Sequence, residues 1–268
     1  MPFSDQHRLV FVAGLHRSGT SPLARCLAAH PQVSGFSGTG VPEDEGQHLQ
    51  TVYPTGRDHG AQGRFALDPR SHLTEDSPLA TAANASQLLA QWTPHWDLTR
   101  PVLLEKSPPN LVRLRFLQAL FPQASFVVVI RHPVVVALGT KKWARTASWR
   151  TLLENWFVAH ETFLADAPQI ERLHLLKYEQ FVADPVGRLA DVGCFLDLTG
   201  PIPADTVQAQ RSSGYQRTWQ QWRSSGNLWR RARYRSLCSR FGDRAERFGY
   251  DIHDLDRVEP LSLTGRTR

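Results

Sequence analysis

The sequence predicts an α/β fold of three layers, in which helices flank a central, mainly parallel β-sheet. Two apolar runs, at residues 8–14 and 124–133, lack the alternation of half-exposed strands and are typical of strands buried on both faces. Segments with apolar residues at helical spacing alternate with such runs along the chain. With 268 residues, 41% of them hydrophobic, the chain is long enough for one large core, and we expect a single domain over residues 1–268.

The same patterns place the individual elements. Strands are expected at 8–14, 101–110, 124–133 and 172–181, and helices at 21–30, 78–96, 111–121, 134–145, 151–167 and 184–198. Residues 33–65 are rich in Gly, Pro and acids and are expected on the surface, and the region 33–80 is expected on the substrate side of the fold. The Arg- and Trp-rich segment 205–250 is either a lid over the site or an arginine-covered amphipathic helix whose tryptophans are core.

Composition disfavours several classes of protein. No apolar stretch is long enough to cross a membrane and the N-terminus lacks a basic leader, so we expect a cytoplasmic protein without a membrane span. Three widely spaced cysteines predict neither a disulfide framework nor a zinc site, and no metal is expected. The net charge of +6 suits an anionic partner. Nucleic acid is the obvious candidate, but the chain has no basic repeat and no zinc finger, which favours a phosphorylated small molecule.

The segment "GLHRSGTS", residues 14–21, has the composition of an anion-binding loop between a strand and a helix. Its glycines allow backbone N–H groups to face an anion, and the N-terminus of the following helix favours negative charge. Three hydroxyl side chains add donors, and Arg17 adds a planar fork that suits tetrahedral oxyanions. A nucleotide-binding P-loop carries a lysine where this chain has Thr20, which disfavours, without excluding, a kinase or nucleotide hydrolase.

Three segments resemble the sulfotransferases that use 3′-phosphoadenosine 5′-phosphosulfate (PAPS). "HRSGTSPLARCLAAHP" resembles their loop for the 5′-phosphosulfate, in the form found in tyrosylprotein sulfotransferases and many bacterial members. "FVVVIRHPVVVALGTKKW" resembles the second signature of the family, and "KYEQFVADP" a later segment at a strand end. The resemblance implies a P-loop-like fold and sulfonyl transfer from PAPS, with 3′,5′-bisphosphoadenosine as the second product and no obligatory magnesium.

The resemblance also implies which residues bind PAPS. Those expected at the 5′-phosphosulfate are Arg17, Ser18, Gly19, Thr20 and Ser21. Arg131 is expected at the 3′-phosphate, and Arg211 in the C-terminal third is expected to join it. The serine that the family carries eight residues after that first arginine is Gly139 here, and Thr140 is expected to replace it. Tyr178 is expected near the adenine, although a buried core position explains it nearly as well.

A general base must take the proton of the acceptor during the transfer. The acidic segment "VPEDEGQHLQ", residues 41–50, corresponds to the position of the catalytic glutamate in tyrosylprotein sulfotransferases. The resemblance favours Glu45 as the base and Glu43 as the second choice, and Asp44 and His48 stay open as alternatives.

A cation must stabilise the charge on the departing phosphate. Lys106 is expected to end a strand, where ligands gather in open α/β sheets. A lysine in the corresponding segment of tyrosylprotein sulfotransferases assists the leaving group. Glu105 is expected to pair with Lys106 or to orient it.

These observations predict a sulfotransferase that moves the sulfonyl group of PAPS by in-line displacement to a hydroxyl or amine. The expected acceptor is a small molecule, a carbohydrate or a lipid, and no motif specifies which one or an oligomeric state. The alternatives are a P-loop kinase or nucleotide hydrolase, and a basic nucleic-acid-binding protein that uses the C-terminal arginines.

Overall fold

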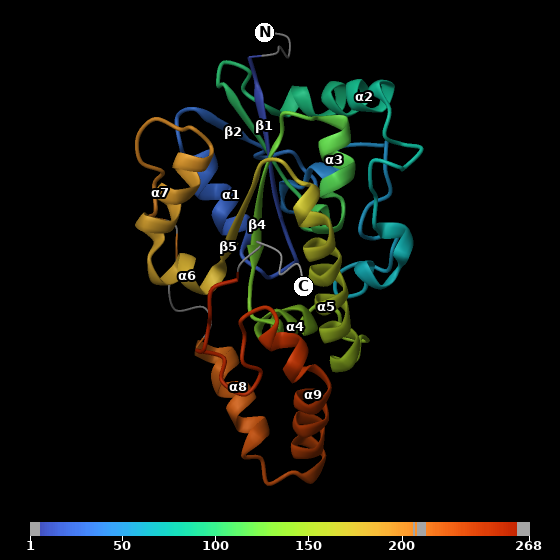
Figure 1. The fold of residues 1–268 in the computed structure, drawn as a ribbon, viewed down its shortest axis with the longest axis vertical. Coiled ribbons are helices and arrows are strands. Elements are labelled where there is room, and N and C mark those ends of the chain that lie inside the picture. The colour runs from blue at the N-terminus through green and yellow to red at the C-terminus, as the bar shows by residue number, and fades with distance from the viewer. Residues whose placement is uncertain (1–5, 206, 208–212, 262–268) are drawn as a thin grey trace.

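The computed structural model describes residues 6–205, 207 and 213–261, and these contain a five-stranded sheet whose neighbouring strands are all parallel (Figure 1). The strand order is β2-β3-β1-β4-β5. β1 (Arg8–Gly14) lies between β3 (Val102–Lys106) and β4 (Ser125–Ile130), and β2 (Val33–Gly35) and β5 (Leu173–Lys177) form the edges. The predicted α/β class with a parallel sheet is confirmed.

The carboxyl ends of the strands meet at one edge of the sheet. Val12, near the end of β1, lies opposite Lys106, the last residue of β3. Ile130, the last residue of β4, lies opposite Lys177, the last residue of β5. The loops that follow these strands therefore start from a common edge, where ligands bind in open α/β sheets.

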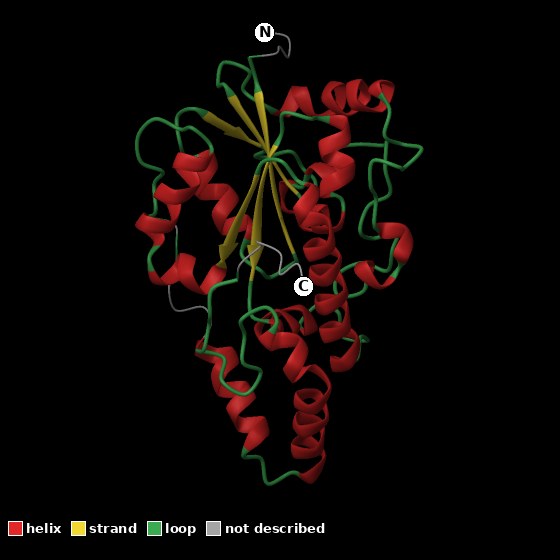
Figure 2. Cartoon of the chain, viewed as in Figure 1, coloured by secondary structure: helices red, strands yellow, loops and turns green. Residues whose placement is uncertain are grey.

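Helices cover both faces of the sheet and make it the middle of three layers (Figure 2). One face is covered by α1 (Thr20–Ala28), α6 (Tyr178–Ala183) and α7 (Pro185–Phe195), and the other by α2 (Ala82–Trp92), α3 (Leu114–Leu120) and α5 (Trp149–Asp166). Because side chains alternate along a strand, Phe11 of β1 belongs to one core, and Val10 and Val12 belong to the other. This arrangement explains why β1 and β4 read as continuous apolar runs.

Side-chain caps mark the start of several helices, among them α2 and α5. The hydroxyl of Ser148 accepts a hydrogen bond from the backbone N–H of Thr151 at the start of α5. At the carboxyl edge, α4 (Pro133–Lys141) begins with a proline, whose missing N–H costs nothing in a first turn. The Nδ1 atom of His132 accepts the N–H of Val134 and completes this cap. Only two residues separate the end of β4 from the start of α4, which lies beside the loops of the carboxyl edge.

α8 (Ser213–Arg223) and α9 (Leu228–Glu246) form a hairpin that projects beyond the carboxyl edge of the sheet (Figure 1). Trp222 of α8 packs edge to face against Trp149, with ring centroids 4.8 Å apart, and Trp219 is buried. The α8 tryptophans are therefore core residues, as one of the two sequence interpretations of this region expects.

Residues 33–65 differ from the expected surface segment. After β2 the chain folds into short 3-10 turns in which Glu45 and Tyr53 are buried. The side-chain oxygen of Gln50 accepts the N–H groups of Val52 and Tyr53, and its Nε2 donates to the carbonyl of Tyr53. Because side chains satisfy the backbone groups, part of this Gly- and Pro-rich segment is buried without regular secondary structure, while other residues of it are exposed as expected.

Candidate active site

The loop after β1 turns sharply at two glycines. Gly14 has φ of 151°, and a Cβ atom there would lie 2.5 Å from the carbonyl oxygen of Val129 on β4. Gly19 has φ of 104° and is the N-cap of α1. Between them, Arg17 has φ of 72°, which is uncommon for a residue with a side chain. Since the first N–H groups of a helix have no helical partner, this turn presents backbone donors to an anion.

Arg131, directly after β4, supports the loop from behind. Its guanidinium donates a hydrogen bond of 2.8 Å to the carbonyl oxygen of Arg17 and lies 4.0 Å from the centre of the Tyr178 ring. A Cβ atom at Gly19 would lie 2.2 Å from the same ring, so only glycine fits here. Burial lowers the pKa of Arg131. The loop, Arg131 and Tyr178 are thus one packed unit.

A cleft beside the loop brings together most of the residues predicted for the chemistry. Its lining includes Arg17, Thr20 and Ser21 of the loop, Glu43 and Glu45 of the acidic segment, and Trp143 after α4. These residues come from three separate parts of the chain, and the carboxyl edge of the sheet unites them. The cleft thus contains both an anion-binding loop and carboxylates.

Glu45, which lines this cleft, forms an ion pair with Lys106, which lines the adjoining hollow. The Nζ atom of Lys106 lies 3.3 Å from Oε1 of Glu45 and donates a hydrogen bond of 2.9 Å to the carbonyl oxygen of Glu43. The Lys106 and Glu45 side chains are only 7% and 6% exposed. A cation at the end of β3 and a carboxylate from the turns after β2 are therefore held together away from bulk water.

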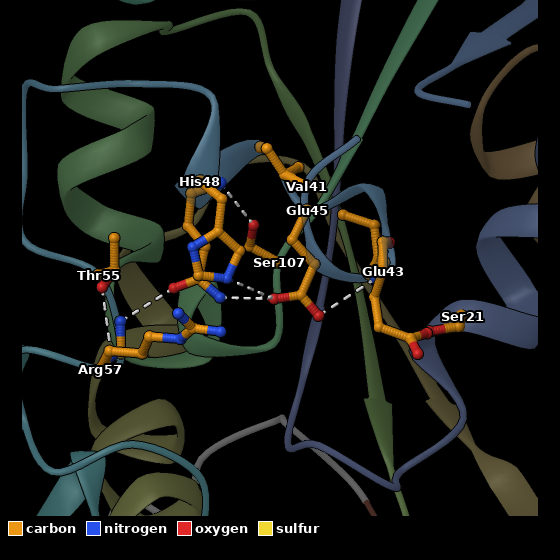
Figure 3. A network of polar contacts seen from close by, with 12 residues as sticks. Ser21, Val41, Glu43, Glu45, His48, Thr55, Arg57 and Ser107 are labelled. Atoms are coloured by element: carbon orange, nitrogen blue, oxygen red, sulfur yellow. Dashed lines mark hydrogen bonds and ion pairs between the residues drawn. The ribbon is translucent and has the colours of Figure 1, made fainter. Parts of the chain in front are cut away.

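The second carboxylate oxygen of Glu45 has its own partners. Gln47 donates to it from Nε2 at 2.5 Å, and Nε2 of His48 lies 3.8 Å from it. Figure 3 shows Glu45 between His48 and Glu43, with Glu43 directed at Ser21. The hydroxyl of Ser21 lies 3.4 Å from the Glu43 carboxylate. Glu43 therefore connects the acidic segment to the loop, and Glu45 connects it to Lys106.

The electrostatics of the cleft favour Glu45 as the base. Burial raises the pKa of Glu45, and the charge of Lys106 offsets part of this rise. Burial, with the charge of Lys106 adding to it, lowers the pKa of His16 to about 3. Burial likewise lowers the pKa of His48, with the charge of Arg57 adding to the effect. Both imidazoles are thus held neutral, whereas the Glu45 carboxylate is shifted toward the pH range useful for proton transfer.

Asp44 is occupied elsewhere. One carboxylate oxygen accepts both the backbone N–H and the hydroxyl of Thr39, at 2.8 and 2.7 Å. The hydroxyl of Thr39 is the main reason that the pKa of Asp44 is lowered. Asp44 and Glu43 have φ of 49° and 54°, a strained conformation of the kind that collects at functional sites. Of the four alternatives for the base, Asp44 is the least suited.

Glu105 does not form an ion pair with Lys106, so the first of its two expected roles was wrong, and the second, that it orients Lys106, stays a prediction. Successive side chains of a strand point to opposite faces, so Glu105 faces away from its neighbour. Its buried carboxylate accepts hydrogen bonds from the N–H of Gly46 at 3.0 Å and from Ser107 and Asn110 at 2.5 Å each. Burial raises the pKa of Glu105 to about 7 despite these bonds. Glu105 therefore anchors the backbone immediately after the candidate base.

The anchored turn is fixed by further contacts. The indole Nε1 of Trp92 donates to the carbonyl oxygen of Gly46, and the N–H of Gln47 donates to the hydroxyl of Ser107, at 3.0 Å each. A Cβ atom at Gly46 would lie 2.5 Å from the side chain of Glu105, so glycine is required. No signal in "LLEKSPPN" announces this arrangement, because its partners lie some sixty residues away.

The residues predicted at the 3′-phosphate differ in how far the structure supports their roles. Thr140 is buried and lines a small cavity against α5, outside the cleft that Arg17 lines. Gly139 faces Arg17 instead, with the Arg17 side chain 3.3 Å from the position of a Cβ atom. Arg211 lies outside the described residues. The roles of Thr140 and Arg211 stay predictions, and the burial of Thr140 does not favour its role.

The sequence analysis did not identify several residues that line the cleft. Trp143 is exposed, and the guanidinium of Arg17 lies 5.0 Å from its ring. Gln47 and Arg57 also line the cleft. An exposed tryptophan next to a predicted signature is a usable signal, but Gln47 and Arg57 belong to an irregular segment whose sequence has no period to interpret.

The hairpin reaches the cleft through Tyr215 in the first turns of α8. The Nζ atom of Lys142 lies 5.0 Å from the centre of the Tyr215 ring. Burial raises the pKa of Tyr215, but hydrogen bonds and charges of Lys142 and Arg17 outweigh this effect and lower it. One end of α8 therefore lies beside Arg17 of the loop, and the lid role of this segment stays a prediction.

The described residues have no cluster of three or more His, Cys, Asp or Glu side chains that could hold a metal ion. In the same part of the chain, no helix combines the length and apolar character that a membrane span requires. Cys26 and Cys238 are buried, and Cys194 is exposed.

The fold and the cleft define an α/β protein of the P-loop-like type, with an anion-binding loop beside a lysine–glutamate pair. Residues 10–201 match the profile of the Sulfotransferase family. This chain is 25% identical over 213 residues to protein-tyrosine sulfotransferase 2 of Gallus gallus, covering 76% of this chain and 54% of that protein. The chain thus spans about half the length of this curated relative.

Solved structures agree at the level of the fold. The sulfotransferase domain of the Synechococcus PCC 7002 olefin synthase superposes with a TM-score of 0.51 at 21% identity, covering 92% of this chain and 98% of that domain. A sulfotransferase from Alicyclobacillus acidocaldarius gives a TM-score of 0.55 at 16% identity, covering 90% and 94%. Because the family profile covers more than half of its length, the chain belongs to the sulfotransferase family. The family that the three motifs predicted is confirmed.

Proposed function

We propose that the protein transfers the sulfonyl group of PAPS to a hydroxyl or amine of an acceptor. The observation that carries the proposal is the buried Lys106–Glu45 pair, 3.3 Å apart, beside a loop built for an anion. A base paired with a cation beside an anion-binding loop is what an in-line sulfonyl transfer requires. When bound, PAPS supplies the sulfonyl group that passes to the acceptor, and 3′,5′-bisphosphoadenosine leaves.

The loop has the donors that the 5′-phosphosulfate needs. Ser18 is buried, and its hydroxyl has no hydrogen-bond partner among the described residues, as expected of a donor reserved for a ligand. Thr20 and Ser21 add hydroxyls at the start of α1, and Arg17 adds a charge at the mouth of the cleft. Gly19 allows the backbone to approach closely. These residues fit the group chemically.

We assign binding of the nucleotide end of PAPS to the packed unit behind the loop. Arg131 offers a buried cation for the 3′-phosphate, and the adjacent Tyr178 ring offers an apolar surface for the base. Thr140 and Arg211 are carried forward as predicted contacts of the 3′-phosphate. Tyr215 of α8 lies beside Lys142 and Arg17, next to the loop.

The proposed roles of the side chains follow from the Lys106–Glu45 pair. Glu45 takes the proton from the acceptor, since burial has moved its pKa toward neutrality. Lys106 keeps Glu45 ionised until then and directs its positive charge to the phosphate oxygen that departs. Glu43 is the second choice for the base, because it is exposed and bonded to Ser21 of the loop.

The acceptor is a small molecule, a carbohydrate or a lipid, entering through the cleft next to Trp143 and Arg57. The cytoplasm is the proposed location.

The test is transfer of label from radiolabelled PAPS to a panel of phenolic, carbohydrate and lipid acceptors, in the presence of a chelator. We expect the wild-type chain to label at least one acceptor class and Glu45→Gln to label it far more slowly. A wild-type chain that labels nothing, or a variant that labels as fast as wild type, contradicts the proposal.

A further inference from the structure

The positive charge of the chain is concentrated in its C-terminal third. Residues 206–242 contain eight arginines and no acidic residue. Because the net charge of the whole chain is only +6, the remainder of the chain is slightly acidic. The hairpin of α8 and α9 makes up most of this basic segment, so the molecule is electrically polar, with the hairpin as its positive end.

The hairpin tip, residues 223–231, carries two large apolar side chains in solvent. Leu228 is 68% exposed and Trp229 is 83% exposed, and both belong to the first turn of α9. Arg223 and Arg230 flank them and are exposed as well. Large apolar side chains grouped on a protruding surface and rimmed by polar residues mark a site of interaction.

The tip is held in a fixed position rather than hanging loosely. The side-chain oxygen of Asn227 accepts the N–H groups of Trp229 and Arg230, at 2.9 and 3.2 Å, and thereby caps α9. Further along α9, Arg244 forms ion pairs of 2.7 and 2.9 Å with Glu154 and Glu161 of α5. The helix is therefore anchored to the body of the protein while its first turn faces solvent.

The position of the tip suits contact with an extended surface. In Figure 1 the turn between α8 and α9 lies at the lower end of the longest axis, remote from the N-terminus. Such a convex end can touch a plane without steric hindrance from the rest of the molecule. A binding groove would instead hold its apolar side chains in a concave wall.

We propose that the hairpin tip docks the protein on an anionic lipid surface, with Trp229 and Leu228 entering the interfacial region and the arginines facing lipid phosphates. Tryptophan is enriched at membrane–water interfaces, and basic residues near the surface are attracted by anionic headgroups. Charge complementarity selects this occupant over a second copy of the chain, since two acid-free tips repel each other. Charge complementarity likewise favours an anionic membrane over a zwitterionic one, because anionic headgroups attract the arginines.

A consequence concerns the orientation of the catalytic cleft. α8 has Tyr215 near the cleft at one end and Arg223 at the tip at the other, and its 11 residues span about 16 Å. A chain docked by its tip therefore keeps the cleft within about 20 Å of the lipid surface. The docking itself does not depend on the proposed transfer reaction.

The experiment is flotation of the full chain with vesicles of phosphatidylcholine alone and with vesicles containing about one third phosphatidylglycerol. We expect binding to the anionic vesicles only. Trp229→Ala should weaken it about tenfold through the lost interfacial side chain. Arg230→Gln combined with Arg231→Gln should weaken it about 25-fold, and added salt should weaken it further.

Matched controls lie on α7, on another face of the molecule. Val186 is 70% exposed there, and Arg188 follows it two residues later, so Val186→Ala and Arg188→Gln should leave vesicle binding unchanged. The same proteins are tested by anisotropy with single-stranded and duplex oligonucleotides. The proposal is overturned if the wild-type chain does not float, if the tip variants float like wild type, or if the tip arginines bind oligonucleotides and not vesicles.

Discussion

The cleft and the hairpin tip both use cations, but the cleft pairs its cation with an acid, whereas the tip has no acid nearby. Lys106 is buried and lies 3.3 Å from Glu45, and the turn that carries Glu45 is tied down by Glu105 and Trp92. Arg223 and Arg230 are exposed in a segment without acidic residues. A paired, buried charge gives fixed geometry, while unpaired, exposed charges give attraction at a distance. We therefore expect the two regions to respond differently to substitution, pH and salt.

The largest effect is expected from Glu45→Gln. The amide keeps the size of the side chain and a hydrogen-bonding oxygen for Lys106, but it cannot take a proton. Turnover should fall by about 10² to 10⁴ with the affinity for 3′,5′-bisphosphoadenosine nearly unchanged. Steady-state kinetics measures the turnover, and a binding titration on the same preparation measures the affinity. Unchanged turnover would transfer the role of base to Glu43 or His48.

Lys106→Ala is expected to lower turnover by about 10² to 10³, because one preorganised cation is lost from the transition state. The same change leaves Glu45 buried without a counter-charge, so the pKa of Glu45 rises further. Since the base acts when deprotonated, the acidic limb of the pH–rate profile should move to higher pH. Lys106→Arg, which keeps the charge, is the matched control and should retain the wild-type limb. A profile that does not move in Lys106→Ala would contradict the pairing.

Arg131→Ala should discriminate between nucleotides. Losing the charged contact should weaken binding of 3′,5′-bisphosphoadenosine about 10- to 100-fold. The variant also loses the bond to the Arg17 carbonyl, which affects every ligand of the loop. Adenosine 5′-phosphosulfate, which lacks the 3′-phosphate, measures that shared loss and should weaken much less. Calorimetry measures both affinities. An equal loss of affinity for both ligands would contradict the assignment of the 3′-phosphate to Arg131.

Glu105→Gln should change the pH dependence of stability. The pKa of Glu105 is raised from its unfolded value to about 7 in the folded chain, so its stabilising contribution is complete at acid pH and is lost as pH rises through 7. Relative to the variant, the wild-type free energy of unfolding should therefore fall between pH 5 and 8, by up to about 3 kcal/mol. Urea denaturation at several pH values measures this slope. Parallel profiles would mean that Glu105 does not titrate in this range.

The smallest effect on catalysis is expected from the tip. Trp229→Ala should leave turnover with a water-soluble acceptor within about twofold of wild type, because an exposed surface side chain contributes little to the fold. Trp222→Ala, in the same hairpin, is the contrast, since its ring packs on Trp149 and its loss should lower the melting temperature. Equal destabilisation by both changes would show that the tip is not a free surface.

The sequence indicated those features that depend on local pattern. The apolar runs of β1 and β4 and the loop around Arg17 follow from composition and spacing, and the fold class and family are confirmed. β2 has only three residues, too few for any period to be detected. The expected pairing of Glu105 with Lys106 failed because strand alternation turns Glu105 away from Lys106, toward partners that only the folded chain brings near.

Other parts of the site depend on contacts distant in sequence. The expectation that Glu45 and Lys106 serve one reaction came from the family resemblance, and the structure brings these two side chains together. Gln47 and Arg57 carried no sequence signal, since an irregular segment fixes them through individual hydrogen bonds. The exposure of Trp229 also differs from that of its neighbours Trp219 and Trp222, which composition alone cannot distinguish.

The most direct test of the account is calorimetric titration of the wild-type chain with 3′,5′-bisphosphoadenosine in a chelator and with ATP in magnesium. The account predicts binding of 3′,5′-bisphosphoadenosine without metal, at least about tenfold tighter than ATP, since Arg131 meets a 3′-phosphate and Thr20 replaces the lysine of a nucleotide-binding loop. Magnesium-dependent binding of ATP, with no binding of 3′,5′-bisphosphoadenosine, would contradict it.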